Sequence, residues 1–552
     1  MAHASFARRL AAVFLAGAVW AAALPLSAGA VNYSDVPADA WYRPYVSHLS
    51  DQGIIQGTGG GKFSPRGTLT RAAFITMLAR SYLTAAQLKE YALQSAFKDV
   101  PTGHYGTPAI NWAKENGVVS GVTASTFAPD RAVTRQEMAV MAVRFADTVG
   151  RRIPASTAAK AYSDASAITS YARDSVTRCQ RAGILTGYQD NTFRPKGSAT
   201  RAEAAALVDR FLQTTSFSSE YTILARRISG VPLKAVIFDP SKYKADLLTG
   251  RDVVDGAETA SSMISRSGAD IALNAAFFNM TNYQAVGTLI RDGEVLTTFE
   301  SFSPEKSALT LDASGKFSVQ KFSTRFAVEL LPASDKEESS PPQRMENLVV
   351  NRWPSSDHDA ARILFTRAWG HDLAFPAKDA VTIGPDGVIL AVDHDKNVEI
   401  PEGCVVLAQR ARRQYEGTFF DSCRVGDTIR ILRSYEGLTS LDPVLSIGAG
   451  PQLVKNGAVY GGLSTYQAEG FTDKNITTYA ARRIAVGVQK DGTLVLVTAE
   501  ATLQALSQAL VSLGCREAIN FDGGGSANLY VDGFWLVGPQ SRKLNTLLTF
   551  RK

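Results

Sequence analysis

Near the end of the chain an acidic residue, three glycines and a serine follow one another, from Asp522 to Ser526. The flanking residues read as two short strands. Successive glycines let the backbone approach a ligand closely, and consecutive amides in such a turn can form a nest that binds an anion. No lysine follows the glycines and no helix is expected after them, so the loop is neither a Walker A loop nor a dinucleotide fingerprint. By itself the motif is equally consistent with a tight turn.

Three more segments place polar or small residues at the ends of expected strands. Asn274 ends a buried-looking strand and precedes Ala275-Ala276, Gly450 lies just before an expected hairpin, and Arg483 begins another. In this order, over roughly residues 265–552, these segments and the glycine loop resemble the phosphodiester glycosidase family. Two departures are Ala275-Ala276, where the family has small glycines, and Ala499-Glu500, where Asp-Gly is common. They bear on substrate fit more than on fold.

The resemblance implies hydrolysis of a sugar-1-phosphodiester, whose anomeric carbon reacts through an oxocarbenium-like state. The leaving phosphomonoester is a stable anion, so the main needs are stabilisation of phosphate charge and an activated water. By implication Arg483 and the amides of Gly523, Gly524 and Gly525 stabilise the phosphate, and Gly450 contacts substrate. Asp522 positions water or sugar with Glu500 in reserve, while Asn274 and Ser526 orient the substrate. The plainer alternatives stay open: a surface charge for Arg483, a turn residue for Asn274 and a turn cap for Asp522.

The elements expected around these residues are mostly β-hairpins. Five turn signals join short β-rich runs, and one helix carries a leucine face; the turn pairs are Asp292-Gly293, Asp386-Gly387, Asn456-Gly457, Asp491-Gly492 and Asp532-Gly533, and the face is Leu503, Leu506, Leu510 and Leu513. We therefore predict an α+β domain with a largely antiparallel or mixed sheet. The polar stretch 334–344 is typical of an exposed loop or an insertion.

A second constellation recurs three times between residues 31 and 213. Each unit opens with an aromatic residue and an aspartate, continues through a helix-like stretch to a glycine, and closes with Thr-Arg at the start of a second helix. The aspartates are Asp35, Asp99 and Asp164; the glycines are Gly53, Gly117 and Gly183; the arginines are Arg71, Arg135 and Arg201. The glycine suits a helix C-terminus and the threonine an N-cap. The spacing from glycine to arginine is identical in the three units, so they are true repeats.

These repeats resemble the S-layer homology domain, and repeat 3 carries that family's Thr-Arg-Ala-Glu motif intact at Thr200 to Glu203. The resemblance implies an all-α, pseudo-trimeric bundle that binds a secondary cell-wall polysaccharide, often a pyruvylated one. The implied binding residues are the three arginines, the three aspartates, Glu137 and Glu203. Repeat 1 has Ala73 in place of the glutamate, so the three grooves need not bind alike. The alternative reading of each arginine is a structural role at the helix start.

The N-terminus predicts an exported protein. Arg8 and Arg9 precede an apolar run that ends in small residues, which is typical of a signal peptide cleaved after Ala30, and no later stretch is long enough to span a membrane. The expected organisation is signal peptide 1–30, repeats 31–95, 96–160 and 161–213, linker 214–222 and a displayed domain 223–552. We expect non-covalent attachment to the cell wall or S-layer.

The composition argues against several kinds of partner and cofactor. The net charge of +6 over 552 residues does not predict a nucleic-acid partner. The four cysteines are too scattered for a disulfide framework, with a Cys404–Cys423 pair left open, and the six histidines form no ligand motif, so no metal and no cofactor are predicted. The favoured function is a wall-anchored hydrolase of glycosyl phosphodiesters. The alternatives are a non-catalytic glycan-binding or envelope-organising protein, and a structural S-layer subunit.

Overall fold

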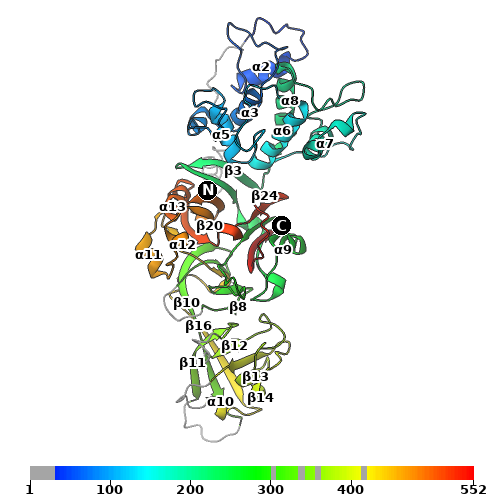
Figure 1. Cartoon of the computed structure of the whole chain (residues 1–552). Coiled ribbons are helices and arrows are strands. Elements are labelled where there is room, and N and C mark those ends of the chain that lie inside the picture. The colour runs from blue at the N-terminus through cyan, green and yellow to red at the C-terminus, as the bar shows by residue number, and fades with distance from the viewer. Residues whose placement is uncertain (1–31, 300–305, 334–341, 355–361, 412–418) are drawn as a thin grey trace, which may run out of the picture. The chain divides into compact units, whose positions relative to one another are not determined.

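The computed structural model describes residues 32–299, 306–333, 342–354, 362–411 and 419–552, and it divides into two compact units, Met1–Gly230 and Val231–Lys552 (Figure 1). The predicted signal peptide and most of the predicted exposed loop at 334–344 lie outside the described residues. No described helix is both long and apolar enough to cross a membrane.

The first unit contains the three repeats, and each has two main helices as predicted. The first helices are α2 (Arg43–Asp51), α5 (Thr107–Glu115) and α7 (Arg173–Arg181); the second are α3 (Arg71–Arg80), α6 (Arg135–Val149) and α8 (Arg201–Thr214), with a short α4 (Ala85–Lys89) and two 3-10 turns, η1 (Ala165–Ala167) and η2 (Ser170–Ala172). The three glycines have φ between +69° and +79°, a left-handed conformation that favours glycine. Thr70, Thr134 and Thr200 each accept the amide three residues on. The helix boundaries therefore follow the predicted caps.

The prediction of an all-α bundle is wrong, because the repeat region is helical only in part. The loops that join the two helices of each repeat are extended and pair with one another around a closed ring. The Leu69 amide donates to the Ala199 carbonyl at 2.9 Å, Ala199 to Val133 at 3.4 Å, and Val133 to Leu69 at 3.0 Å. Glycine and proline keep these loops out of helices, so their free backbone groups bond between repeats instead.

One hydrophobic cluster runs through all three repeats. It includes Cys179, which is fully buried. The short strand β1 (Arg151–Arg152), which follows α6, pairs with β2 (Ser216–Phe217), which follows α8 and precedes β3 (Tyr221–Ile228). The β3 backbone is held by side chains of the repeats: Trp112 Nε1 donates to the Ala225 carbonyl at 2.9 Å, and the Ala225 amide donates to Tyr82 Oη at 3.0 Å. The segment expected as a linker, 214–222, thus contains the end of α8, β2 and the start of β3.

The second unit is built from three sheets with short helices. One sheet contains, in order within this unit, β19 (Ala458–Val459), β18 (Gln452–Lys455), β22 (Cys515–Phe521), β20 (Ala481–Gln489), β21 (Leu494–Ala501) and β4 (Val231–Phe238). A five-stranded sheet has the order β24 (Phe534–Val537), β23 (Leu529–Val531), β6 (Ile271–Asn274), β25 (Thr546–Arg551) and β5 (Lys244–Thr249).

The third sheet has eleven strands. Its order is β14 (Ile389–Lys396), β13 (Ala377–Ile383), β15 (Val405–Gln409), β12 (Ile363–Phe365), β11 (Gln343–Val350), β10 (Phe317–Leu331), β9 (Lys306–Asp312), β17 (Pro443–Gly448), β7 (Leu289–Arg291) and β8 (Glu294–Thr297), with β16 (Thr428–Glu436) beside β10. The helices of this unit are α9 (Ala260–Ser267), α10 (Phe419–Ser422), α11 (Leu463–Ala468), α12 (Lys474–Thr477) and α13 (Leu503–Ser512). The described pairings are antiparallel except that of β11 with β12. A largely antiparallel, mixed-sheet domain was predicted and is confirmed.

All five predicted hairpins are present, namely β7–β8, β13–β14, β18–β19, β20–β21 and β23–β24. Of the predicted leucine face, Leu503, Leu506 and Leu510 are buried on α13, and Leu513 is the C-cap residue; the helix begins after an N-cap at Thr502 and packs on β18 and β22. The Asn-Gly and Asp-Gly pairs predicted these hairpins correctly because their preference for positive φ is local and does not depend on tertiary packing. These strands bring the ends of β6, β20 and β22 together.

Candidate functional site

The glycine loop leaves the end of β22 and turns at once. Asp522 is partly buried beside it, and its Oδ1 accepts the Gly523 amide at 2.9 Å. A Cβ at Gly523 would lie 2.4 Å from the Arg482 carbonyl oxygen, so this path requires glycine there, and the φ of +57° at Gly524 favours glycine at the next position. Burial raises the pKa of the Asp522 carboxyl to about 6, although Ser526, the Gly523 amide and Arg542 act in the opposite direction. The carboxyl can therefore exchange a proton near neutral pH.

Asn274 joins the end of β6 to this loop. Its Nδ2 donates to the Asp522 carbonyl at 2.6 Å, and its Oδ1 accepts the Asn528 amide at 2.8 Å. Asn528 in turn donates from Nδ2 to the Ser526 carbonyl at 2.9 Å. Two buried asparagines thus fix both ends of the loop, and one of them, Asn274, lies 248 positions before Asp522 in the chain.

Arg483 lies next to the loop, but its guanidinium is buried and turned toward backbone. Nη2 donates to the carbonyls of Asn475 and Tyr479 at 2.8 and 2.6 Å, and Nε donates to Ala501 at 3.2 Å. Burial lowers the pKa of this group, opposed by Asp473. Its described contacts therefore hold the α12 turn against β20 and β21.

The remaining two predicted residues differ in placement. Glu500 is exposed and pairs with Arg482 across β20 and β21, so it lies on the opposite face from Arg483. Gly450 adjoins the loop: its amide donates to the Asn520 carbonyl at 2.9 Å, two residues before Asp522. The structure brings Asn274, Asp522, Ser526 and Gly450 together and leaves Glu500 outside.

Sequence reasoning missed a second arginine at the loop. Arg542 Nη1 donates to Ser526 Oγ at 3.3 Å, and its guanidinium carbon lies 2.8 Å from where a Gly525 Cβ would stand. Arg542 is exposed, unlike Arg483. The only sequence signal was a short basic run, Arg542-Lys543, which nothing in its spacing connects to residue 525.

Glu469 was also missed. It is fully buried, and neither carboxylate oxygen makes a hydrogen bond of normal geometry among the described residues. Its Oε2 lies 3.3 Å from the Cβ position of Gly450. Burial raises its pKa, while the nearby Ser307 hydroxyl, Lys321 and two amides lower it. A carboxyl group thus lies directly behind the predicted substrate-contacting glycine.

In the first unit, the side chain of the arginine at the start of each second helix contacts the next repeat. Arg71, Arg135 and Arg201 donate from Nε to the carbonyls of Phe127, Phe193 and Phe63 at 2.8–2.9 Å, and each guanidinium lies over the ring of that same phenylalanine. The pattern runs from repeat 1 to 2, 2 to 3 and 3 to 1. The arginines therefore clamp the repeats together.

The three aspartates fasten loops within their own repeats. Asp99 accepts the amides of Phe127 and Ala128 at 2.8 and 2.6 Å, and Asp35 and Asp164 repeat this pair of bonds. Burial acts against ionisation of Asp99, but the two amides more than offset it and lower its pKa. Ala128 has φ +58°, so the carboxylate also stabilises a strained turn.

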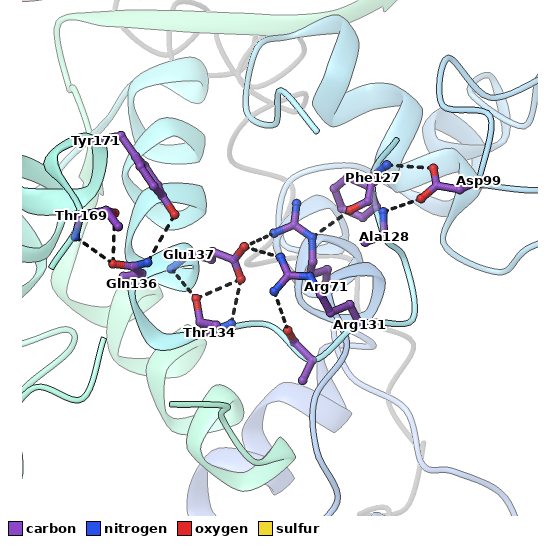
Figure 2. Close-up of polar contacts among 11 residues, drawn as sticks. Arg71, Asp99, Phe127, Ala128, Arg131, Thr134, Gln136, Glu137, Thr169 and Tyr171 are labelled. Carbon is purple, nitrogen blue, oxygen red and sulfur yellow. Dashed lines mark hydrogen bonds and ion pairs between the residues drawn. The ribbon is translucent and has the colours of Figure 1, made fainter. Parts of the chain in front are cut away.

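A groove of about 360 Å³ opens beside Arg71. Figure 2 shows Arg71 and Arg131 converging on Glu137, which also accepts the Thr134 amide at 2.9 Å in a capping box. Arg144 and Tyr171 also line the groove. Glu203 makes the same capping box in repeat 3, and repeat 1 has Ala73 there, so the Arg201 position lacks a matching carboxylate.

An exposed aromatic residue recurs in register and was not predicted. Trp41, Tyr105 and Tyr171 each lie twelve residues before the first glycine of their repeat, and their relative exposure is 57%, 58% and 56%. Tyr171 lines the Arg71 groove, although it belongs to repeat 3. Exposed rings at equivalent positions suit the apolar face of a sugar.

Family models match both parts of the chain. The S-layer homology domain matches residues 32–75, 96–139 and 161–205, and phosphodiester glycosidase matches residues 383–551. The chain carries three S-layer homology repeats and a phosphodiester glycosidase domain. These repeats make it a cell-surface protein attached to the wall. The glycosidase match includes Arg483, Asp522 and the glycine loop, and it begins after Asn274.

Curated relatives cover about a third of the chain. An endoglucanase from Bacillus sp. (strain KSM-635) is 34% identical over 183 residues, which is 33% of this chain and 19% of that protein. A cellulosome-anchoring protein of Acetivibrio thermocellus is 25% identical over 40% of this chain and 45% of its own length. The chain spans a fifth or less of the first curated relatives it matches.

Among solved structures, a hypothetical protein from Synechocystis has a TM-score of 0.50 at 20% identity, covering 60% of this chain and 62% of that one. This likeness concerns the fold. The catalytic domain of zebrafish N-acetylglucosamine-1-phosphodiester alpha-N-acetylglucosaminidase aligns at 14% identity and a TM-score of 0.31, over 60% of this chain and 81% of that one.

All four cysteines are buried and free, so Cys404 and Cys423 form no disulfide. Within the described residues no group of three or more His, Cys, Asp or Glu side chains could hold a metal ion.

Proposed function

We propose that the displayed domain hydrolyses glycosyl phosphodiester bonds of surface or extracellular glycans, with an N-acetylglucosamine-type sugar as the first substrate to test. The observation that carries this proposal is the meeting of Asp522, Ser526 and Arg542 around a glycine loop that Asn274 fixes. The phosphodiester glycosidase match supports the reaction class.

In this proposal water attacks the anomeric carbon, the bond from that carbon to the phosphate oxygen breaks, and the phosphomonoester leaves as an anion. Asp522 accepts the proton of the water, for which a pKa of about 6 is well suited near neutral pH. Arg542 and the loop amides stabilise the phosphate charge. Because the donors of Arg483 are used by backbone carbonyls, we assign it to positioning β20 beside the loop.

The test is release of phosphomonoester from N-acetylglucosamine-1-phosphodiesters by the full mature chain. We expect turnover that falls by at least about a hundredfold in Asp522→Asn, the usual size of a general-base contribution. Arg542→Gln should lose activity as well, while Arg551→Gln, an exposed arginine on β25, should not. A folded protein without turnover on a panel of sugar phosphodiesters would contradict the proposal.

One observation favours the alternative, a non-catalytic glycan-binding protein: the buried Arg483 and the outward Glu500 leave two of the four predicted catalytic side chains without access to substrate. The Asp522→Asn variant distinguishes the hydrolase from the glycan-binding protein. A binding protein should keep its affinity for glycan in this variant, and the wild type should show no hydrolysis.

We further propose that the repeats bind a secondary cell-wall polysaccharide, often pyruvylated, in the grooves between repeats. The Arg71 groove supports this because it combines cations, a carboxylate and an exposed ring. Changing the clamp arginines to alanine would damage the fold, so groove residues with fewer structural contacts are better probes. Arg144→Gln and Tyr171→Ala should reduce co-sedimentation with purified wall polymer, and Lys89→Gln, exposed on α4, should not.

A further inference from the structure

A small cavity lies between β9, β10 and β17 in the second unit. Its polar lining consists of two cations and four hydroxyl residues; these are Lys306, Arg325, Thr288, Thr298, Ser323 and Thr324. None of the described lining residues carries a carboxylate. Its volume of about 30 Å³ holds two water-sized groups, which matches the oxygens of one oxyanion rather than a whole sugar ring.

Lys306 is the cation at this cavity that no described carboxylate pairs. Its Nζ lies 4.8 Å from the ring centroid of Phe299 and 4.9 Å from that of Phe471, and it donates to the Glu469 carbonyl. No ion pair to Lys306 exists among the described residues, whereas Arg325 is paired with Glu436 at 2.9 Å. Two rings and one carbonyl hold the ammonium in place, so it is pre-positioned for an anion.

Hydroxyl donors face the same space. Thr324 Oγ1 is buried and makes no hydrogen bond in the described structure. Thr298 Oγ1 accepts the Val350 amide at 3.0 Å, which leaves its hydrogen available to donate. An unpartnered buried hydroxyl is costly unless a ligand or water bonds to it. The cavity thus offers several donors. The Glu469 carboxyl group interacts with Lys306 electrostatically, but it does not line the cavity and accepts no hydrogen bond from Lys306.

The cavity adjoins the proposed catalytic loop through the backbone. Gly448 lines it and lies two residues before Gly450, whose amide bonds to Asn520. Phe471, one of the two rings beside Lys306, packs on Phe277 at 5.8 Å, three residues after Asn274. A glycan whose phosphodiester lies at the loop could therefore place a neighbouring anionic substituent here.

We infer that this cavity is an oxyanion subsite, in which Lys306 and Thr324 bind a phosphate or carboxylate carried by the glycan near the bond that is cleaved. The inference deepens the proposed function and rests on it for the identity of the ligand as substrate. The subsite makes the domain selective for anionic glycans over neutral ones.

The experiment measures binding, by calorimetry at low ionic strength, to the full mature chain carrying Asp522→Asn, so that turnover plays no part. The probes are glucose 6-phosphate, glucuronate and glucose. We expect glucose 6-phosphate to bind and glucose not to, with glucuronate showing whether a carboxylate suffices. Lys306→Met should weaken binding by roughly tenfold or more, the usual worth of a charge-assisted hydrogen bond. Lys316→Met, an exposed lysine in the β9–β10 turn, should not change it.

Equal affinity for glucose 6-phosphate and glucose, or equal binding by the Lys306→Met and Lys316→Met variants, would overturn the inference. If Lys306→Met does not fold, Thr324→Val gives the same comparison without removing a charge. If binding depends on Lys306 but the wild-type chain does not hydrolyse a phosphodiester, the proposed reaction is refuted and the subsite is supported. If the Lys306→Met variant hydrolyses substrate as fast as wild type, and anionic glycans are not preferred over neutral ones, the subsite alone is refuted.

Discussion

Asp522 combines an unusual proton affinity with a position directly before Gly523, where the close Arg482 carbonyl leaves no room for a side chain. Its pKa is raised from 3.8 to about 6 because burial penalises the carboxylate, and the contacts of Ser526, Gly523 and Arg542 only partly compensate. A carboxyl group destabilised in this way is typical of sites that use it for proton transfer.

We predict that kcat/KM for a phosphodiester substrate rises with pH through about 6, because Asp522 must be ionised to accept a proton from water. Stability should change in the opposite direction. The native chain binds this proton more tightly than the unfolded chain, so the free energy of unfolding falls as pH rises from about 4 through about 6.

Asp522→Asn should therefore be more stable than wild type by ~1–2 kcal/mol at pH 8, discounted for partial exposure, with the difference fading below pH 3.8. Thermal unfolding of both proteins across this range measures it. A constant difference at every pH would mean that the carboxyl does not titrate as described.

Arg71 illustrates how one residue type at one register can be structural. We predict that Arg71→Ala lowers the free energy of unfolding by ~2–4 kcal/mol, because the Phe127 carbonyl and the partly buried Glu137 lose their partner. Arg66→Ala, at an exposed site in the same repeat, should change it by less than about 0.5 kcal/mol. Denaturant unfolding of the two variants measures this difference, and equal destabilisation by Arg71→Ala and Arg66→Ala would contradict the clamp role.

At the scale of elements, the loop between the two helices of each repeat depends on its aspartate. Asp99→Ala should destabilise by ~1–3 kcal/mol, since two amides lose their acceptor and Ala128 remains at positive φ. Asp130→Ala removes an acid that is 80% exposed and should have little effect.

The pKa of Asp99 is lowered, so its contribution should be complete above the ordinary carboxyl pKa of 3.8 and disappear as pH falls below it. Urea midpoints measured for the wild type and Asp99→Ala should converge in strong acid. Persistence of the full difference there would exclude an ionised acceptor.

At the scale of the whole molecule, the repeats close into a ring rather than stacking in an open row. The loop hydrogen bonds from Leu69 to Ala199, Ala199 to Val133 and Val133 to Leu69 need all three members, and one hydrophobic cluster contains residues of every repeat. In an open solenoid each repeat contacts only its sequence neighbours, whereas in this ring each repeat bonds to both of the others.

We predict that a fragment of residues 31–230 folds alone and unfolds in one cooperative transition. A fragment of residues 31–160, which lacks repeat 3, should lack that transition, because Arg135 and Leu69 then have no partners in repeat 3. Far-UV circular dichroism on heating distinguishes the two. Independent melting of two repeats in the shorter fragment would contradict the ring.

The sequence by itself determined the features that depend on neighbouring residues. Thr70, Gly53 and their counterparts set helix ends, and Asn-Gly and Asp-Gly set the hairpins, because capping and positive φ are local preferences. The three-fold register likewise follows from spacing alone. The all-α prediction failed since the inter-helix loops satisfy their backbone groups between repeats, which no local pattern reveals.

Tertiary structure alone decided where the donors point. Arg483 and the repeat arginines were identified by type and position, yet their guanidinium groups bond to carbonyls up to 145 residues away. Arg542 and Lys306 acquire their significance only from packing against Ser526, Phe299 and Phe471. Register specifies which residue type stands on an element, whereas burial and long-range pairing determine whether that residue can reach a ligand.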